Sequence, residues 1–271
     1  MKTPQMKTPR ITLILAALAC ALAAPAGYLQ AADGSAKPAA TRAGGLKEDM
    51  IALDRAYIPA LAITNRNPQP DEARRAMEAL NRQWASFKQK HLTAKGGDRQ
   101  WKADMEKIDG LIAAANRIVD SGKDLIKAHE ELEGVRLTFL AMRERSRMPY
   151  YLDDITRFHE PMEEMFLAAK GKTADTLTDA DLAKIKATFP KAEKLWSRVK
   201  AGQADPAFRL TSEQREELNK LLAGESRALD ALKQAIASGD KAAIAKAAQG
   251  IRAPYAALYI SFGDFTALGK K

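Results

Sequence analysis

Residues 151–170 read YLDDITRFHEPMEEMFLAAK, and their spacing predicts an amphipathic helix. Apolar side chains recur every three or four residues, at Leu152, Ile155, Met162 and Phe166, and His159 falls on the same stripe. This period matches the 3.6 residues of a helical turn and differs from the two-residue period of a strand. The segment therefore predicts a helix that buries one face and carries a histidine on that face.

The rest of the chain repeats this pattern between turn signals. Ala, Leu, Lys, Glu and Arg are abundant and only 6% of residues are aromatic, which favours helix. Breaks are predicted at Asn67-Pro68-Gln69-Pro70, Gly96-Gly97, Gly122, Met148-Pro149 and Asp205-Pro206. Thr178 and Thr211 are predicted N-caps. Helices are expected at about 46–66, 70–93, 98–121, 123–147, 151–170, 178–201, 211–237 and 240–262. The predicted fold class is all-α.

An internal repeat is predicted from four pairs of short matches that occur in the same order. The pairs are Arg55-Ala56-Tyr57-Ile58-Pro59 with Arg157-Phe158-His159-Glu160-Pro161, Trp84 with Trp196, Ser121-Gly122 with Ser238-Gly239, and Gly134-Val135-Arg136 with Gly250-Ile251-Arg252. We expect a tandem duplication of an up-and-down four-helix bundle, with units at 46–148 and 149–271. The tryptophans are expected in the core, and Arg136 and Arg252 are expected to pair with acids on neighbouring helices.

The first 26 residues have the three-part pattern of a secretory signal peptide. Lys2, Lys7 and Arg10 precede an apolar run, Ile11 to Ala24, which is short for a membrane span of roughly 20 residues. A retained anchor and a lipoprotein modified at Cys20, the only cysteine, are the alternatives. Residues 27–45 are rich in Ala, Gly and Pro and are predicted to form a disordered linker. The expected location is the periplasm or the exterior, with no membrane span after signal cleavage.

The net charge and the distribution of charged residues limit which classes of molecule are expected to bind the protein. The formal net charge is +9, and loss of the three basic residues of the signal peptide leaves +6. Acidic residues are interspersed with the basic ones, so most charges are expected on solvated helix faces. Nucleic acid is not an expected partner outside the cytoplasm. A periplasmic protein or a small ligand is the expected partner, and a modestly basic chain suits acidic ones.

Two HxxxE pairs on consecutive predicted helices are the candidate site. His129 has Glu133 one turn on, and His159 has Glu163 at the same spacing. Imidazole and carboxylate are the ligands of zinc, iron and copper sites in helical bundles. The third histidine, His91, lies near a predicted helix end and is expected to serve a capping or solvent role.

The predicted positions of these four residues along their helices do not decide between a mononuclear and a dinuclear metal site. In a hairpin hinged near Met148, with about 1.5 Å of rise per residue, His129 lies about 28 Å from the hinge and His159 about 16 Å. Glu133 and Glu163 are level, at about 22 Å by the same rise. A single ion bound by both histidines is therefore awkward. A carboxylate-bridged dinuclear site and one ion per HxxxE pair are the alternatives.

Other chemistries are weighed against this metal site. The structural alternative is a buried histidine bonded to a glutamate or a carbonyl. The sequence lacks a CxxCH motif, so haem would have to be b-type, with His159 or Met162 as a ligand. It also lacks a P-loop, a GxGxxG motif and a nucleophile elbow, which favours a binding protein over an enzyme. A dinuclear carboxylate enzyme and a metal-free, chaperone-like protein are kept as alternatives.

Three short resemblances accompany these predictions. Leu210-Thr211-Ser212-Glu213-Gln214 resembles the LTxxQ pattern of helical periplasmic stress chaperones, and it also fits a capping box. The aromatic end, 254–265, is similar to the ends of uncharacterised secreted helical proteins of bacteria. With its His/Glu pairs, the chain distantly resembles the imelysin family of iron-uptake-linked periplasmic proteins. That family has GxHxxE where both pairs here are HxxxE.

Overall fold

The computed structural model describes residues 45–65, 70–94 and 98–269, and in these ranges the chain is all-α, as predicted. Its elements in order are α1 (Leu46–Thr64), α2 (Pro70–His91), α3 (Arg99–Ser121), α4 (Leu125–Arg145), α5 (Tyr151–Ala169), α6 (Asp179–Ala201), η1 (Pro206–Phe208), α7 (Ser212–Ser238), α8 (Lys241–Gly250), α9 (Arg252–Ile260) and η2 (Thr266–Leu268). The predicted signal peptide, Cys20, nearly all of the predicted linker and the Gly96-Gly97 break lie outside the described residues.

Local sequence chemistry sets most helix ends. Thr178 and Thr211 are N-caps, as predicted, and each forms a full capping box with the residue three positions on. Gly122 and Gly239 end α3 and α7 in the left-handed conformation. Glycine adopts this conformation without the steric cost that a Cβ atom imposes. These ends agree with the predicted ones to within about two residues.

The expected last helix, 240–262, is divided into α8 and α9. The interruption lies at Ile251, three residues before Pro254. Proline has no N–H to donate to the carbonyl of Gly250, four residues earlier, and its ring crowds that carbonyl. The division lets α9 leave the axis of α8 and cross toward α1, which it contacts.

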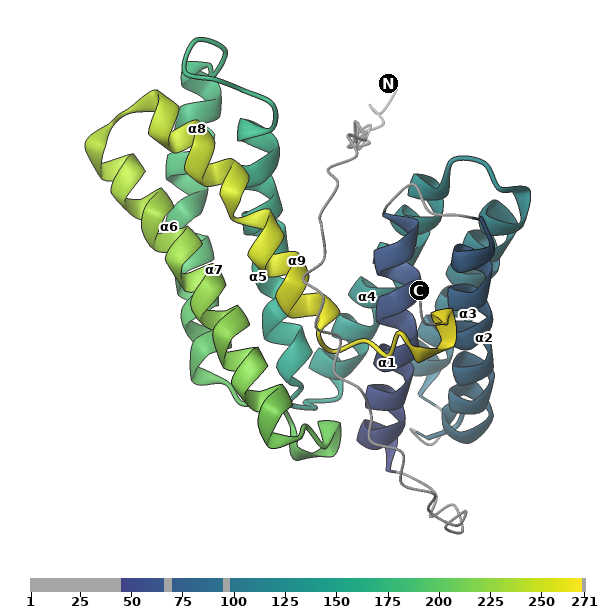
Figure 1. The fold of residues 1–271 in the computed structure, drawn as a ribbon. Helices are drawn as coiled ribbons and strands as arrows, with labels where there is room; N and C mark the ends of the chain where they lie inside the picture. Colours follow the sequence, from purple (N-terminus) through teal and green to yellow (C-terminus); the bar gives the residue numbers. More distant parts are fainter. Residues whose placement is uncertain (1–44, 66–69, 95–97, 270–271) are drawn as a thin grey trace, which may run out of the picture.

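The helices pack as two groups, which Figure 1 shows side by side. In the first group each of α1 to α4 contacts the next, and α4 also contacts α1. In the second group α5 packs on α6, α6 on α7 and α7 on α8, while α8 returns to α5. This is the neighbour order of an up-and-down bundle. The internal duplication stays a prediction.

Both paired tryptophans are core residues. Trp84 and Trp196 are 4% and 3% exposed, and they lie in α2 and α6. The Trp84 indole N–H donates to Asp109 of α3, and the Trp196 indole N–H donates to Ser226 of α7. Each indole therefore buries its ring and satisfies its donor on the following helix of its own group.

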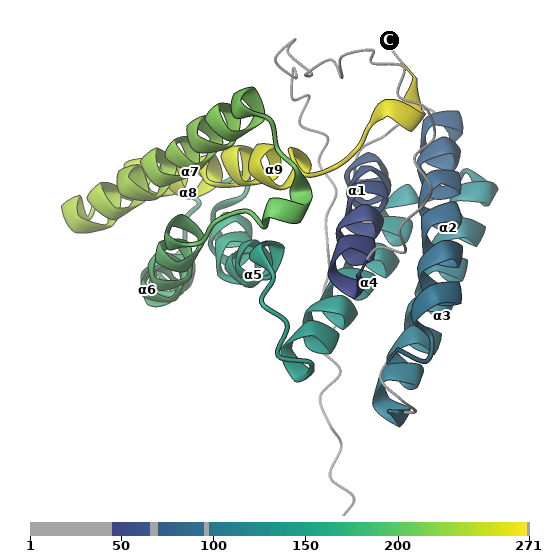
Figure 2. The ribbon, with the colours of Figure 1, turned by 90° about the horizontal axis from the view of Figure 1, so that it is seen from below.

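The two groups meet along α1, α4, α5 and α9. The chain turns from α4 into α5 through Arg147, which is in the left-handed conformation, and Pro149. Helices α4 and α5 contact each other only slightly, so they do not form the close hairpin assumed from the sequence. After α9, the C-terminal segment crosses back to the first group, where η2 packs on α2, as Figure 2 shows from below.

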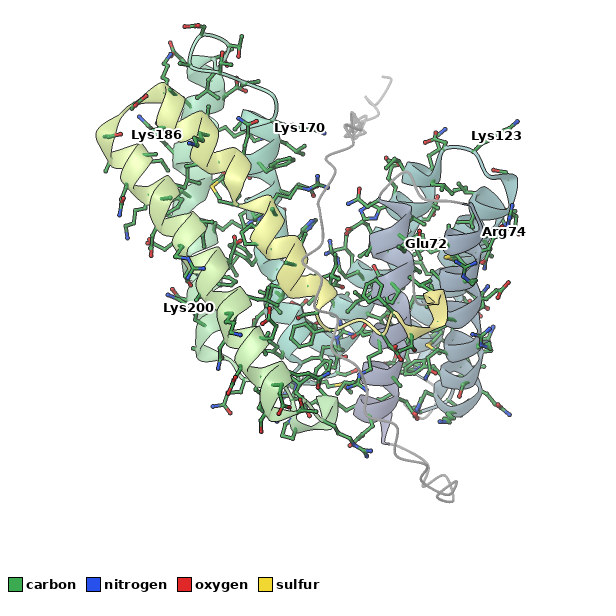
Figure 3. The ribbon with its side chains drawn as sticks, viewed as in Figure 1. Glu72, Arg74, Lys123, Lys170, Lys186 and Lys200 are labelled. Atoms are coloured by element: carbon green, nitrogen blue, oxygen red, sulfur yellow. The ribbon has the colours of Figure 1, made fainter. Side chains whose placement is uncertain are left out.

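Charged side chains cover the outside of both groups. Figure 3 shows Lys186 and Lys200 of α6 on the outer side of the second group, and both are exposed. In the part of the chain that the structure describes, no helix combines the length and the apolar character needed to cross a bilayer.

Candidate functional site

The four residues predicted as metal ligands lie together where the two helix groups meet. We call them the His/Glu cluster: His129 and Glu133 come from α4, and His159 and Glu163 come from α5. Their side chains are between 14% and 27% exposed, so the cluster is half-buried but open to solvent. Each histidine faces its own glutamate across one helical turn, as the HxxxE spacing predicts.

The first pair is fixed by a carbonyl of α1. His129 Nδ1 lies 2.9 Å from the carbonyl oxygen of Leu61. A carbonyl only accepts, so Nδ1 carries the proton and Nε2 of the neutral ring holds a lone pair. Nε2 lies 3.5 Å from Glu133 Oε1. Burial lowers the pKa of His129, against an opposing rise from Glu133, and favours this neutral form.

The second pair is fixed by a cation. His159 Nδ1 lies 2.9 Å from Arg136 Nη2, which can only donate, so the proton of the neutral ring is on Nε2. Nε2 faces Glu163 Oε2 at 3.5 Å. Burial, together with the Arg136 charge, lowers the pKa of His159 well below its usual value. Burial raises the pKa of Glu163, and the charge of Glu133 raises it further.

Arg136 stands at the centre of this arrangement and is 5% exposed. Its Nη2 donates both to Glu133 and to His159, which brings the two HxxxE pairs together. Its Nη1 lies 3.4 Å from the hydroxyl of Tyr255, and its guanidinium carbon lies 5.5 Å from the ring centre of Tyr259. Its Nε has no hydrogen-bond partner among the described residues. Arg136 is therefore a buried cation shared by α4, α5 and α9.

Aromatic side chains border the His/Glu cluster on the side of α9. The ring of Tyr255 lies 5.2 Å from that of His159 and stacks on Tyr259 at 6.2 Å. Tyr57 of α1, which the sequence repeat aligns with His159, donates its hydroxyl to the carbonyl of Leu132 at 2.7 Å. These rings limit access to the cluster from α9 and α1.

The distance between the two ligands of each pair suits a metal ion, but two ligands are too few to form a complete metal site. Two ligands that each lie about 2.0–2.2 Å from a tetrahedral ion are about 3.3–3.6 Å apart, and both His–Glu distances fall in that range. Within the described residues, no three His, Cys, Asp or Glu side chains are close enough to hold an ion as they stand. A complete site would need the two pairs to approach each other.

Two sequence interpretations are corrected by the structure. His91 does not face solvent: it is 8% exposed, and its Nε2 lies 2.8 Å from Asp49 Oδ2 on α1. Arg136 pairs with Glu133 on its own helix and reaches α5 through an imidazole instead of an acid, whereas Arg252 lies over the ring of Phe166 at 5.0 Å. The central position of Arg136 was missed, although the repeat drew attention to the residue.

No model of a known protein family matches the sequence, and no curated protein or solved structure is significantly similar to the chain.

Proposed function

We propose that this chain is a non-enzymatic binding protein that takes up a divalent transition-metal ion at the His/Glu cluster. The observation that supports this is the convergence of both HxxxE pairs on one half-buried place, with each nitrogen 3.5 Å from its carboxylate oxygen. His129 already directs an unprotonated Nε2 at Glu133, which is the form of imidazole that binds metals. Burial lowers the pKa of both rings, so neither ring readily takes the second proton that would prevent metal binding.

The chemistry of the donors selects the class of ion. Two imidazole nitrogens and two carboxylates suit zinc, iron or copper better than the all-oxygen shell that calcium and magnesium take. The ligands come from α4 and α5, which belong to different helix groups, so an ion bound by both pairs would link the groups. We propose the periplasm as the place of action, because residues 1–26 have the pattern of a secretory signal.

The test compares two histidines of the same protein. The exported chain, purified without an affinity tag, is analysed for metal as isolated and after titration with zinc, copper and iron. We expect His159→Ala to lose the ion while keeping its helical circular dichroism. His91→Ala is the matched control, because His91 is also hydrogen-bonded to an acid but lies outside the cluster. It should bind metal like the wild type. Equal uptake by the two variants would contradict the proposal.

A second function is favoured by Arg136. The guanidinium supplies the positive charge beside Glu133 and a donor for His159, so the cluster is stable without any ion. The chain would then be a metal-free scaffold that binds a partner through its helix surfaces. A wild-type protein that is isolated without metal and takes up none of the three ions would establish this alternative over the first.

A further inference from the structure

Arg136 occupies the place that an ion bound by both pairs would need. Its Nη2 touches Glu133 of one pair and His159 of the other, and the residue is almost fully buried. A guanidinium carries a permanent charge and cannot lose it by deprotonation. A divalent ion placed beside it would meet a like charge and would compete with it for the Glu133 carboxylate. The ion and the guanidinium therefore exclude each other at this position.

The tautomer of His159 adds a second reason for exclusion. While Nδ1 accepts from Arg136, the proton of the neutral ring is on Nε2, the nitrogen that faces Glu163. A metal on Nε2 requires that proton to be on Nδ1, and a protonated Nδ1 cannot accept from a guanidinium. A metal on Nδ1 would displace the guanidinium directly. Either way, His159 becomes a ligand only after Arg136 has left it.

The other contacts of Arg136 lead to α9. Nη1 lies near the hydroxyl of Tyr255, and the guanidinium lies over the ring of Tyr259. Helix α9 also contacts α1, α5 and α7, so it belongs to the joint between the two groups. Nε of Arg136 has no partner among the described residues, so the present position leaves one buried donor unsatisfied, which reduces the free-energy cost of moving the side chain.

We propose that Arg136 is an internal cation that blocks the His/Glu cluster, and that metal uptake expels it and loosens the packing of α9. This inference rests on the proposed function, since it describes how the same site is regulated. It makes the joint between the helix groups sensitive to the ion. A metal-free chain holds α9 against α4 through Arg136, and a loaded chain releases that contact.

The first test measures zinc affinity by competition with a chromogenic chelator, using the exported full chain. We expect Arg136→Met to bind zinc about tenfold or more tightly than the wild type, a coupling of ordinary size. Arg157→Met is the matched control: like Arg136, Arg157 joins α4 and α5, through Glu144 and Asp154, but both of these acids lie outside the His/Glu cluster. It should change the affinity much less. Arg136→Gln, which keeps a donor without the charge, serves if the methionine variant does not fold.

The second test measures amide hydrogen exchange with and without zinc. Zinc should increase amide hydrogen exchange in α9, Arg252–Ile260, of the wild type, and the increase should be absent in Arg136→Met. If the wild type binds zinc but Arg136→Met binds it equally or more weakly, or if α9 does not respond, the blocking role is wrong and the metal site stands. If neither protein binds zinc, both the blocking role and the proposed function fail.

Discussion

At the scale of single residues, Glu225 is a carboxyl group buried without compensation. It lies in α7 with no exposed surface, and neither of its oxygens has a hydrogen-bond partner among the described residues. The backbone N–H of Tyr255 acts to lower the pKa of Glu225. Burial outweighs this and raises the pKa of Glu225 to about 8. The carboxyl group is therefore protonated in the folded protein at neutral pH.

Glu225→Gln tests this burial through the pH dependence of stability. The folded pKa lies above the unfolded value, so the native state binds the extra proton and its stability falls as pH rises from the unfolded pKa toward about 8. Glutamine cannot ionise and removes that loss. The difference in unfolding free energy between the variant and the wild type should grow by about 3 kcal/mol between pH 4 and pH 7. Urea denaturation at several pH values measures it. The same experiment on Glu216→Gln, an exposed position of α7, should give a flat difference.

The partners of the histidines show which contacts of single residues can be predicted from the sequence and which cannot. The pairing of His159 with Glu163 follows from intrahelical spacing, so the sequence could predict it. The bond from Arg136 to His159 depends on how α4 and α5 approach in space, which no local pattern encodes. The position of His91 near a helix end predicts a capping or solvent role, because its true environment is not visible in the local sequence. Its partner, Asp49, lies on another helix and is 42 residues away in sequence.

At the scale of elements, Arg143 joins three helices in a buried ion network. From α4 it donates two hydrogen bonds to Asp153 of α5, at 2.9 and 2.6 Å, and its Nη1 lies 3.9 Å from Asp54 of α1. Its guanidinium also lies over the ring of Tyr150 at 4.2 Å. Burial raises the pKa of Asp153 to about 6 despite the opposing effect of Arg143. Arg143 is the cation that interacts with both acids and favours their charged forms.

Arg143→Met should therefore destabilise the protein strongly, because it leaves two buried acids without their partner. Breaking a buried pair in this way costs about 3–5 kcal/mol. Chemical denaturation gives the free energy of unfolding. Arg157→Ala is the matched control, since Arg157 pairs with Glu144 and Asp154 near the surface, where a salt bridge contributes about 1 kcal/mol or less. Similar losses in the two variants would mean that the network around Arg143 does not hold α1, α4 and α5 together.

Elements themselves were the part of the fold best predicted from sequence. Helix ends depend on local chemistry, so Thr178, Thr211 and Gly122 could be assigned as caps without knowledge of the tertiary structure. The division between α8 and α9 was missed, although Pro254 was visible. A proline inside an apolar pattern is compatible with a kink or a break, and packing against neighbouring helices selects between them.

At the scale of the whole molecule, the two helix groups are joined by side chains that sequence patterns do not connect. The prediction of two units rests on repeated motifs, but repetition does not specify which faces meet. The joint uses Arg136, Arg143 and the aromatic residues of α9, together with the C-terminal segment that runs from α9 to α2 (Figure 2). Long-range contacts of this kind depend on the complementarity of complete surfaces, which explains why the cluster's surroundings could not be predicted.

Substitution of Gly263 by alanine tests whether the C-terminal segment holds the two helix groups together. A Cβ atom at Gly263 would lie 2.9 Å from Ile58 Cγ2 and 3.1 Å from Pro59 Cδ, both on α1, and 2.8 Å from the ring of Phe265. The next residue donates its backbone N–H to the carbonyl of Arg55 at 2.8 Å, so the segment cannot move away from α1 without losing that bond. Overpacking of this kind costs about 1–3 kcal/mol, and Gly263→Ala should lower the free energy of unfolding by that amount.

The matched control for Gly263→Ala is Gly110→Ala. Gly110 is exposed inside α3, and an added Cβ would meet nothing within 4 Å. Because alanine has the higher helix propensity, this change should stabilise the protein by about 0.5–1 kcal/mol. The two substitutions add the same methyl group, so opposite signs of the change in unfolding free energy would isolate the effect of the contact with α1.

Hydrogen exchange shows where the structure is loosened. Gly263→Ala should speed exchange at the amide of Asp264, which is hydrogen-bonded to the carbonyl of Arg55, and leave exchange in α3 unchanged. If Gly263→Ala does not change the free energy of unfolding, the C-terminal segment does not hold α9 against the first group. The joint would then depend on the contacts of Arg136 and Arg143 alone.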